Sequence, residues 1–375
     1  MRCTSPRSAP TITWSSGCLT PAWPTPPAGP SYLPPEALSG LGQVLGAAIT
    51  EEPDSGLTAI RLGFRMSTTE RAAPAGTGSQ GAGAADSATT DPKRLSLRAV
   101  LHYLWHEAEL ATWSPGMAGK RNWRVVSWHL RAAAHGKMTR GKPLLARLFI
   151  PEPFTAEKKT EIAARRLSCW ARLQQPGHGQ QFMMLIGELK AIEPARFGHK
   201  LLVKHLPDAP LMLDDVLLGR LNRHFRDELE LWQIDENGHL MVIATFSLSR
   251  CGLATAEEVS LVMTDHNWLP YESQPDKLLL HVAIGQHRRF SKSLRYNLAG
   301  DKPMASLVFT DTPTPTAAFL VNDEADREAA RERATETDTE IWTWAIGEDM
   351  PPLPPPAASS PGPLRQRPNS MSRNA

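Results

Sequence analysis

Cysteine is scarce in this sequence and forms no recognisable motif. The 375 residues contain four cysteines, which lie far apart and include no C-x-x-C pair: Cys3, Cys18, Cys169 and Cys251. This spacing argues against a disulfide framework and against a zinc site built from thiolates. A reducing cytoplasm is therefore the expected location.

Long apolar runs are also missing. No stretch approaches the roughly 20 apolar residues of a membrane-spanning helix, and the N-terminus lacks the continuous apolar segment of a signal peptide. We expect a cytoplasmic protein with no membrane partner. The sequence has no Walker loop, and no G-x-G-x-x-G motif follows a predicted strand. Because both motifs are missing, we expect no cofactor, and a protein without enzymatic activity is favoured.

Acidic residues are absent from one long segment, residues 111–150, which we call the basic window. It contains no Asp or Glu but eight cations, Lys120, Arg121, Arg124, Arg131, Lys137, Arg140, Lys142 and Arg147. Trp113, Trp123 and Trp128 lie among them. Because cations neutralise phosphates and indole rings stack on bases, the window predicts a contact surface for DNA or RNA. The alternative is a solvated face that keeps the protein soluble.

The charge of the whole chain conceals this asymmetry. The net charge is only +2, because residues 322–349 carry ten acids against three arginines. A cationic surface and an acidic C-terminal segment are therefore expected on the same molecule.

Apolar spacing predicts helices over 95–110 and 117–134, joined by a connection that contains Pro115 and Gly116. This pair resembles a helix-turn-helix. A third helix is expected over 155–173, and strands dominate after Gln181. The expected class is α+β: an N-terminal helical lobe with the helix-turn-helix-like pair, followed by a mixed α/β C-terminal lobe.

Composition divides the chain into six segments. They are a disordered or frameshifted head (1–35), a helix plus strand (36–66), a flexible linker (67–92), a basic helical lobe (93–174), a mixed α/β lobe (175–349) and a proline-rich disordered tail (350–375).

A second basic stripe is expected on a helix over 275–298. Arg288, Lys292 and Arg295 follow an i, i+4, i+7 spacing, which places them on one helix face. Together with Lys120, Arg121, Arg124 and Arg131, they form the predicted nucleic-acid contact set. A duplex would lie across both surfaces if they share a groove.

Two weaker patterns suggest metal chemistry. Glu188 and Lys190 on a predicted strand match half of a metal-dependent nuclease core, in which a carboxylate holds Mg²⁺ and a lysine orients water or phosphate. The other explanation is an ordinary ion pair on an edge strand. His102 and His106 are four residues apart on a helix, the spacing for two imidazoles on one metal, but the sequence places no third ligand.

The head of the chain has two interpretations. Residues 1–35 show no helical or strand period, as in a disordered segment. Written in GC-rich codons and read in the neighbouring frame, Trp14 to Gly29 can instead spell LVKRMPDTGLAHAAG, which suggests a frameshift or misplaced start upstream of Ser31.

Several longer phrases carry a family resemblance: PPEALSGLGQVLGAAI, LHYLWHEAEL, WSPGMAGKRNW, LFIPEPF, GHKLLVKHLPD, FSKSLRYNL and DTPTPTA. Together they resemble an uncharacterised bacterial family catalogued as domain of unknown function 1173, over about Tyr32 to Pro352. The resemblance implies carriage on plasmids and integrative elements, and it brings no catalytic residues. Family members begin with a KRMPDTG-like phrase followed by His and Cys, which agrees with the frameshift interpretation.

Three functional hypotheses follow. The first is a nucleic-acid-associated accessory protein of a bacterial mobile element, with a protein of that element as a further partner. The second is a divergent metal-dependent nuclease that uses Glu188, Lys190 and Mg²⁺. The third is a protein-interaction module without catalysis, which uses the tryptophan-rich surface and the acidic segment.

Overall fold

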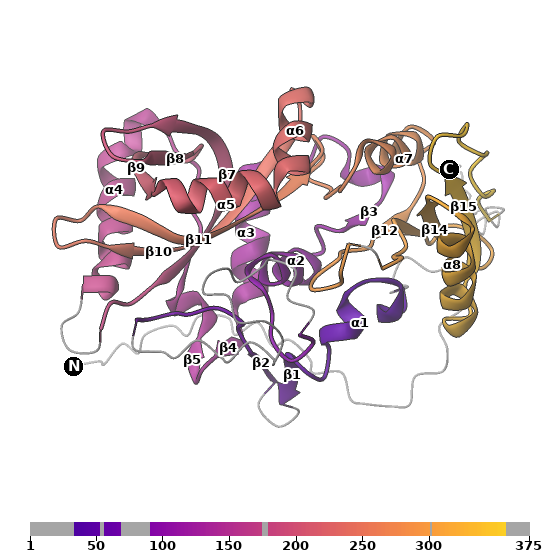
Figure 1. Cartoon of the computed structure of the whole chain (residues 1–375), viewed down its shortest axis with the longest axis horizontal. Helices are drawn as coiled ribbons and strands as arrows, with labels where there is room; N and C mark the ends of the chain where they lie inside the picture. The colour runs from indigo at the N-terminus through magenta and orange to yellow at the C-terminus, as the bar shows by residue number, and fades with distance from the viewer. Residues whose placement is uncertain (1–33, 53–55, 69–90, 175–178, 301, 358–375) are drawn as a thin grey trace, which may run out of the picture.

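A computed structural model of the chain describes residues 34–52, 56–68, 91–174, 179–300 and 302–357. The expectations for residues 1–33, for most of the linker and for the tail beyond residue 357 lie outside these ranges. Figure 1 shows three sheets side by side, with helices packed between and around them.

Eight α-helices are present in the described ranges. They are α1 (Leu41–Val44), α2 (Leu97–Glu107), α3 (Trp123–Ala134), α4 (Lys159–Trp170), α5 (Asp215–His224), α6 (Arg226–Ile234), α7 (Gln274–Gly285) and α8 (Glu324–Glu336). Short 3-10 turns are η1 (Glu36–Leu38), η2 (Pro115–Met117), η3 (Leu144–Ala146), η4 (Ala156–Lys158) and η5 (Ala171–Gln174).

Side-chain caps set where several helices begin. The Asn122 side chain accepts a hydrogen bond from the Val125 amide at the start of α3, and Asp214 does the same for Leu217 at the start of α5. Each cap pairs an amide that has no partner within the helix.

The strands form three sheets. The first contains β1 (Ile49–Glu52), β2 (Leu57–Ile60), β4 (Lys137–Thr139) and β5 (Lys142–Pro143). The second contains β6 (Leu148–Phe149), β7 (Met183–Pro194), β8 (His199–Val203), β9 (Leu206–Leu213), β10 (His239–Leu248) and β11 (Ala254–Thr264). The third, in the order β15-β14-β13-β12-β3, contains β15 (Glu340–Ala345), β14 (Thr316–Val321), β13 (Leu307–Phe309), β12 (Phe290–Lys292) and β3 (Thr112–Trp113).

The second sheet closes on itself. Strand β7 pairs antiparallel with β8, and β8 with β9, while β9 and β11 meet in parallel at Met212 and Thr255. Strand β11 pairs antiparallel with β10, which returns to β7. Five strands thus form a ring in the order β7-β8-β9-β11-β10. Helices α5 and α6 lie between β9 and β10 in the chain. This connectivity is that of an OB-fold, a five-stranded, partly open Greek-key barrel.

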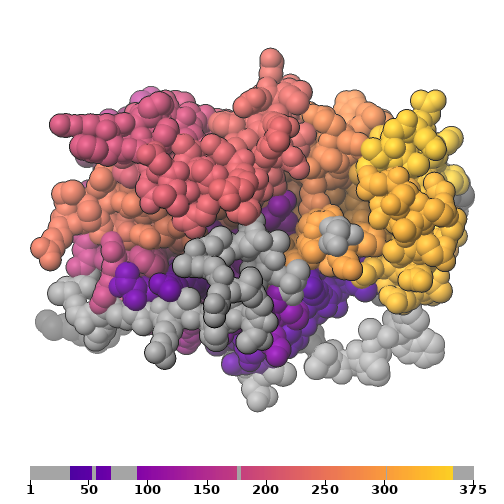
Figure 2. All heavy atoms as spheres, in the orientation of Figure 1, coloured from indigo at the N-terminus to yellow at the C-terminus, as the bar shows by residue number. Residues whose placement is uncertain are grey.

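The interior of the barrel is an apolar core. Inside, Leu189, Leu201 and Leu211 belong to a core that also includes Leu217 and Leu221 of α5. Figure 2 shows α5 and α6 at the surface of the viewed face, and α8 covers the third sheet at the yellow end.

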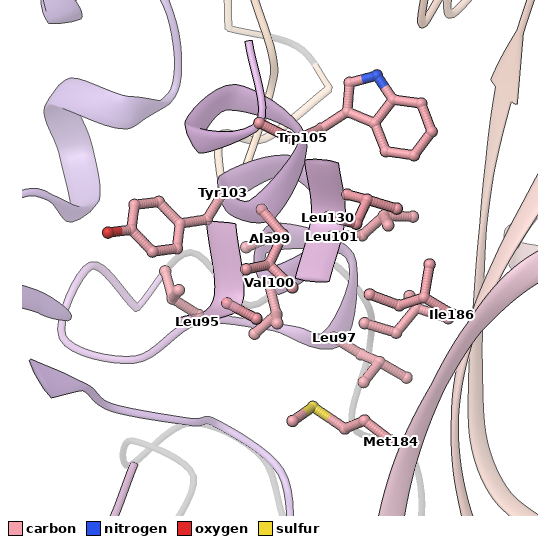
Figure 3. Close-up of a cluster of buried hydrophobic side chains, with 14 of the residues drawn as sticks. Leu95, Leu97, Ala99, Val100, Leu101, Tyr103, Trp105, Leu130, Met184 and Ile186 are labelled. Atoms are coloured by element: carbon pink, nitrogen blue, oxygen red, sulfur yellow. The ribbon is translucent and has the colours of Figure 1, made fainter. Parts of the chain in front are cut away.

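The outer side of β7, β10 and β11 is also buried, because helices α2 and α3 cover it. Met184 and Ile186 of β7 belong to one core with Leu97 and Leu101 of α2 and Leu130 of α3 (Figure 3). A single apolar cluster therefore joins the N-terminal segments to the barrel.

The expected class, an α+β fold with a separate N-terminal helical lobe, is wrong. The described chain has a mixed α/β fold in which strands β1 to β6 alternate with the N-terminal helices. The expected helix-turn-helix-like pair is also wrong, because residues 108–122, with β3 and η2, separate α2 from α3. A helix-turn-helix needs a turn of roughly three or four residues.

The long helix expected over 275–298 is also wrong. Helix α7 ends at Gly285, and His287 has a φ of 56°, in the left-handed region that ends helices. The chain continues into β12, so the expected i, i+4, i+7 face does not exist.

Candidate functional site

Several cations of the basic window bind groups of the protein itself, and Arg121 shows this best. Nη1 of Arg121 donates to the carbonyl oxygens of Leu110 at 2.8 Å and Asn267 at 3.2 Å. Nη2 donates to the Thr112 oxygen at 2.6 Å. Burial lowers the pKa of Arg121 to about 10. This guanidinium therefore connects the segment after α2 to the segment around Asn267 through hydrogen bonds, and it is not available to bind phosphate.

Three further cations of the window also bind groups of the protein itself. Nη2 of Arg131 donates to the Ile150 oxygen at 2.5 Å, and Nζ of Lys137 forms an ion pair with Glu107 at 2.5 Å. Arg140 donates to the Phe64 oxygen at 3.1 Å. The basic window contains no acidic residue, but its cations bind carbonyl oxygens and a carboxylate that the fold brings close to them.

The outer face of α3 keeps part of the predicted surface. Lys120 and Arg124 are exposed, and their side chains form no hydrogen bond or ion pair with any residue the structure describes. Trp128 lies one turn further along and is 64% exposed. Trp113 and Trp123 are buried. We call Lys120, Arg124 and Trp128 the α3 strip.

The second predicted stripe is buried and paired. Arg288 forms a bidentate ion pair with Asp311, with nitrogen–oxygen distances of 2.7 and 2.9 Å. Lys292 lies 3.1 Å from Asp276, and both side chains are buried. Nε of Arg295 binds Glu272 at 2.8 Å. The structure does not bring these three cations together with the α3 strip.

Glu188 and Lys190 have different surroundings. The buried Oε1 of Glu188 lies 2.9 Å from Nζ of Lys204 and 2.8 Å from Nδ1 of His239. Burial raises the pKa of Glu188, but the hydrogen bonds with His239 and Lys204 outweigh it, so that pKa lies below its usual value. Lys190 is exposed. This carboxylate is occupied by two side chains that compete with a metal ion.

His102 and His106 do not converge on a common ligand set. Nδ1 of His102 accepts a hydrogen bond from the Tyr296 amide at 3.0 Å, and burial lowers the pKa of His102 to about 3. Burial also lowers the pKa of His106. Among the described residues, no group of three His, Cys, Asp or Glu side chains is placed to hold a metal ion.

The barrel offers a surface that the sequence did not reveal. Register and burial place Lys190 of β7 and Lys200 of β8 on the outer side of the wall, because their neighbours Leu189 and Leu201 point inward. Lys204 lies in the turn directly after β8. Lys200 pairs with Glu193 at 3.0 Å, and Lys204 with Glu188. A net positive charge remains on this face.

The loop between β7 and β8, residues 195–198, extends this surface. Phe197 is 78% exposed, and the Arg196 guanidinium lies 5.4 Å from the centre of its ring. Gly198 has a φ of 67°, and a Cβ there would lie 2.3 Å from the Leu213 oxygen. In the sequence, Phe197 stands directly before Gly198 between two predicted strands, and this pattern could have indicated an exposed ring in a turn.

The loop between β10 and β11 lies at the same end of the barrel. His199 pairs with Leu213, and Met212 pairs with Thr255, so the starts of β8 and β11 flank the end of β9. Arg250 in the β10–β11 loop is exposed. We call the outer side of β8 and β9, with Lys190 and the two loops, the barrel face.

A family model described as "Protein of unknown function (DUF1173)" matches residues 25–347. The chain belongs to the DUF1173 family. Comparison with curated proteins and with solved structures gives no match. Within the described part of this DUF1173 chain, no helix has the length and apolar character needed to cross a membrane.

Proposed function

We propose that this protein binds single-stranded nucleic acid on the barrel face. The strand order of the closed ring carries the proposal. In OB-fold barrels, the outer side of the second and third strands and the loops 1–2 and 4–5 hold oligonucleotides. Here these positions are β8, β9 and the loops 195–198 and 249–253.

The side chains on this face match what a single strand requires. An exposed ring such as Phe197 stacks on any base, and the adjacent Arg196 adds a cation. Lys190 on β7, Lys200 on β8 and Lys204 in the turn after β8 supply cations for the phosphates of a strand that follows this face. These contacts follow the backbone and ring faces, so little base preference is expected.

The α3 strip is proposed as a second contact surface. Lys120 and Arg124 supply cations without internal partners among the described residues, and Trp128 supplies an exposed indole. The proposal leaves out five predicted cations that bind backbone oxygens or carboxylates and are buried or only partly exposed: Arg121, Arg131, Arg288, Lys292 and Arg295. Lys200 and Lys204 also form ion pairs, but their side chains are 35% and 50% exposed. Association with a mobile element and its proteins and a cytoplasmic location stay predictions from the sequence.

The test measures fluorescence anisotropy of labelled single-stranded DNA and RNA, with duplex DNA as comparison. Phe197→Ala should weaken single-strand binding by about 1–3 kcal/mol, the value of one stacked base. Ile234→Ala is the matched control, because Ile234 is similarly exposed at 67% but lies at the end of α6. Equal effects of the two variants would contradict a stacking role.

Salt dependence tests the lysines separately. Each of Lys190→Ala, Lys200→Ala and Lys204→Ala should flatten the slope of log K against log salt by about 0.7, the value for one phosphate on a single strand. Lys302→Ala, which removes an exposed cation from the loop before β13, should leave the slope unchanged. Absence of binding, or binding that ignores salt, would overturn the proposed function.

A further inference from the structure

A cavity between α2, α5 and β11 is lined by none of the residues that form the two proposed contact surfaces. Its volume is about 80 Å³, enough for several water molecules. Phe64, Leu97, Leu217 and Phe225 supply apolar walls. The polar lining is concentrated in a few side chains from these three elements.

Cations from different elements line this cavity. Arg94 precedes α2 and Arg220 lies on α5, and neither guanidinium forms an ion pair with a described residue. Arg98 also lines the cavity, but Glu228 holds it at 3.0 Å. Two arginines that form no ion pair with a described residue create a local preference for an anion.

The floor of the cavity contains a polar group that lacks a partner. Ser260 of β11 is 2% exposed, and its Oγ has no hydrogen bond among the described residues. The buried Nε of Arg220 is also without a hydrogen-bond partner there. Buried polar groups are rarely unpaired in native proteins, so these groups indicate a ligand that pairs with them.

One acid distinguishes this cavity from a general anion site. Glu258 lines it, two residues before Ser260 on the same side of β11, and forms no hydrogen bond with a described residue. The pKa of Glu258 is raised above its usual value, chiefly by burial, although the Arg220 and Arg65 charges act in the opposite direction. In its ionised form, the Glu258 carboxylate only accepts hydrogen bonds, so a ligand that pairs with this form must donate a hydrogen bond.

We propose that this cavity binds inorganic phosphate as the monohydrogen form. Arg94, Arg220 and Ser260 would receive its oxygens, and the P–OH group would donate to Glu258. Sulfate has the same shape and charge but carries no proton at neutral pH, and a phosphomonoester has lost its proton by that pH. The carboxylate therefore selects free phosphate over both.

Isothermal titration calorimetry of the full chain at pH 7.5 and constant ionic strength tests this site, with sodium phosphate, sodium sulfate and adenosine 5′-monophosphate as probes. Phosphate should bind at least about tenfold more tightly than either other anion, the value of one charge-assisted hydrogen bond. No phosphate binding up to roughly 10 mM, or equal binding of sulfate, would overturn the proposal.

Three variants locate the site. Arg220→Gln should abolish phosphate binding, whereas Arg223→Gln, an exposed arginine on the same helix that does not line the cavity, should not. Glu258→Gln should bring the phosphate and sulfate affinities to within a few fold, because an amide donates as well as accepts. Unchanged selectivity in Glu258→Gln would contradict the assignment. Nucleic-acid binding is measured separately, so failure of one proposal leaves the other testable.

Discussion

Nζ of Lys292 lies 3.1 Å from Oδ2 of Asp276, and both side chains are almost completely buried. Nζ also donates to the Ser306 oxygen at 2.7 Å. This pair ties β12 to the start of α7. A cation expected on a nucleic-acid surface is thus an internal connection of the fold.

Lys292→Met should destabilise the protein by about 3–5 kcal/mol, because it leaves the Asp276 charge buried without its partner. The free energy of unfolding from urea titration measures the effect. Replacing both residues with apolar ones should cost less than the single change. A loss below 1 kcal/mol in Lys292→Met would contradict the burial of this pair.

Arg121 and Arg124 are close in sequence and should respond in opposite ways. Arg121→Ala leaves several carbonyl oxygens unpaired and should cost about 2–4 kcal/mol of stability. Arg124→Ala should stay within about 0.5 kcal/mol, as for an exposed side chain, but should weaken nucleic-acid binding. Urea titration and anisotropy on both variants distinguish a structural arginine from a contact arginine.

His102 should make stability depend on pH. Its pKa is about 3 in the folded protein, against an ordinary value of 6.5, so the unfolded chain binds one more proton between these values. The contribution is complete above pH 6.5 and is lost as pH falls towards 3, by about 1.4 kcal/mol per unit. Between pH 6.5 and 5, the wild type should therefore lose about 2 kcal/mol more than His102→Gln. Parallel pH profiles would exclude this origin.

Gly198→Ala should disturb the loop that presents Phe197. The positive φ and the approach to the Leu213 oxygen leave no room for a Cβ, so a destabilisation of about 1–3 kcal/mol is expected. Single-strand binding should weaken with it. Gly347→Ala, which shares a positive φ but has open space at its Cβ and follows β15 outside the barrel face, is the control for strain alone. Binding losses of the same size in both variants would argue against a role for the 195–198 loop.

Local signals in the sequence were sufficient for several elements. The helix predicted over 95–110 is α2, and the helix predicted over 155–173 includes α4. The barrel was not predictable in this way, because its closure depends on pairing such as Met241 with Glu188, which are far apart in the chain. Strand patterns specify faces but not partners.

The candidate site illustrates the same limit. Counting charges in the basic window identified Lys120 and Arg124 on an exposed helix face. The same count could not predict that Arg121 binds carbonyl oxygens, because backbone carbonyl groups carry no net charge and do not enter a count of charged residues. Phe197 was overlooked since a lone aromatic residue in a turn has no periodic pattern.

The covering of the barrel wall by α2 and α3 has a consequence for how the molecule is assembled. Met184, Ile186 and Met241 would meet water if the chain were shortened to the barrel alone, and an apolar area of that kind promotes aggregation. The N-terminal helices thus keep this apolar surface of the barrel away from water. Heating should therefore unfold the N-terminal segments and the barrel in one cooperative transition.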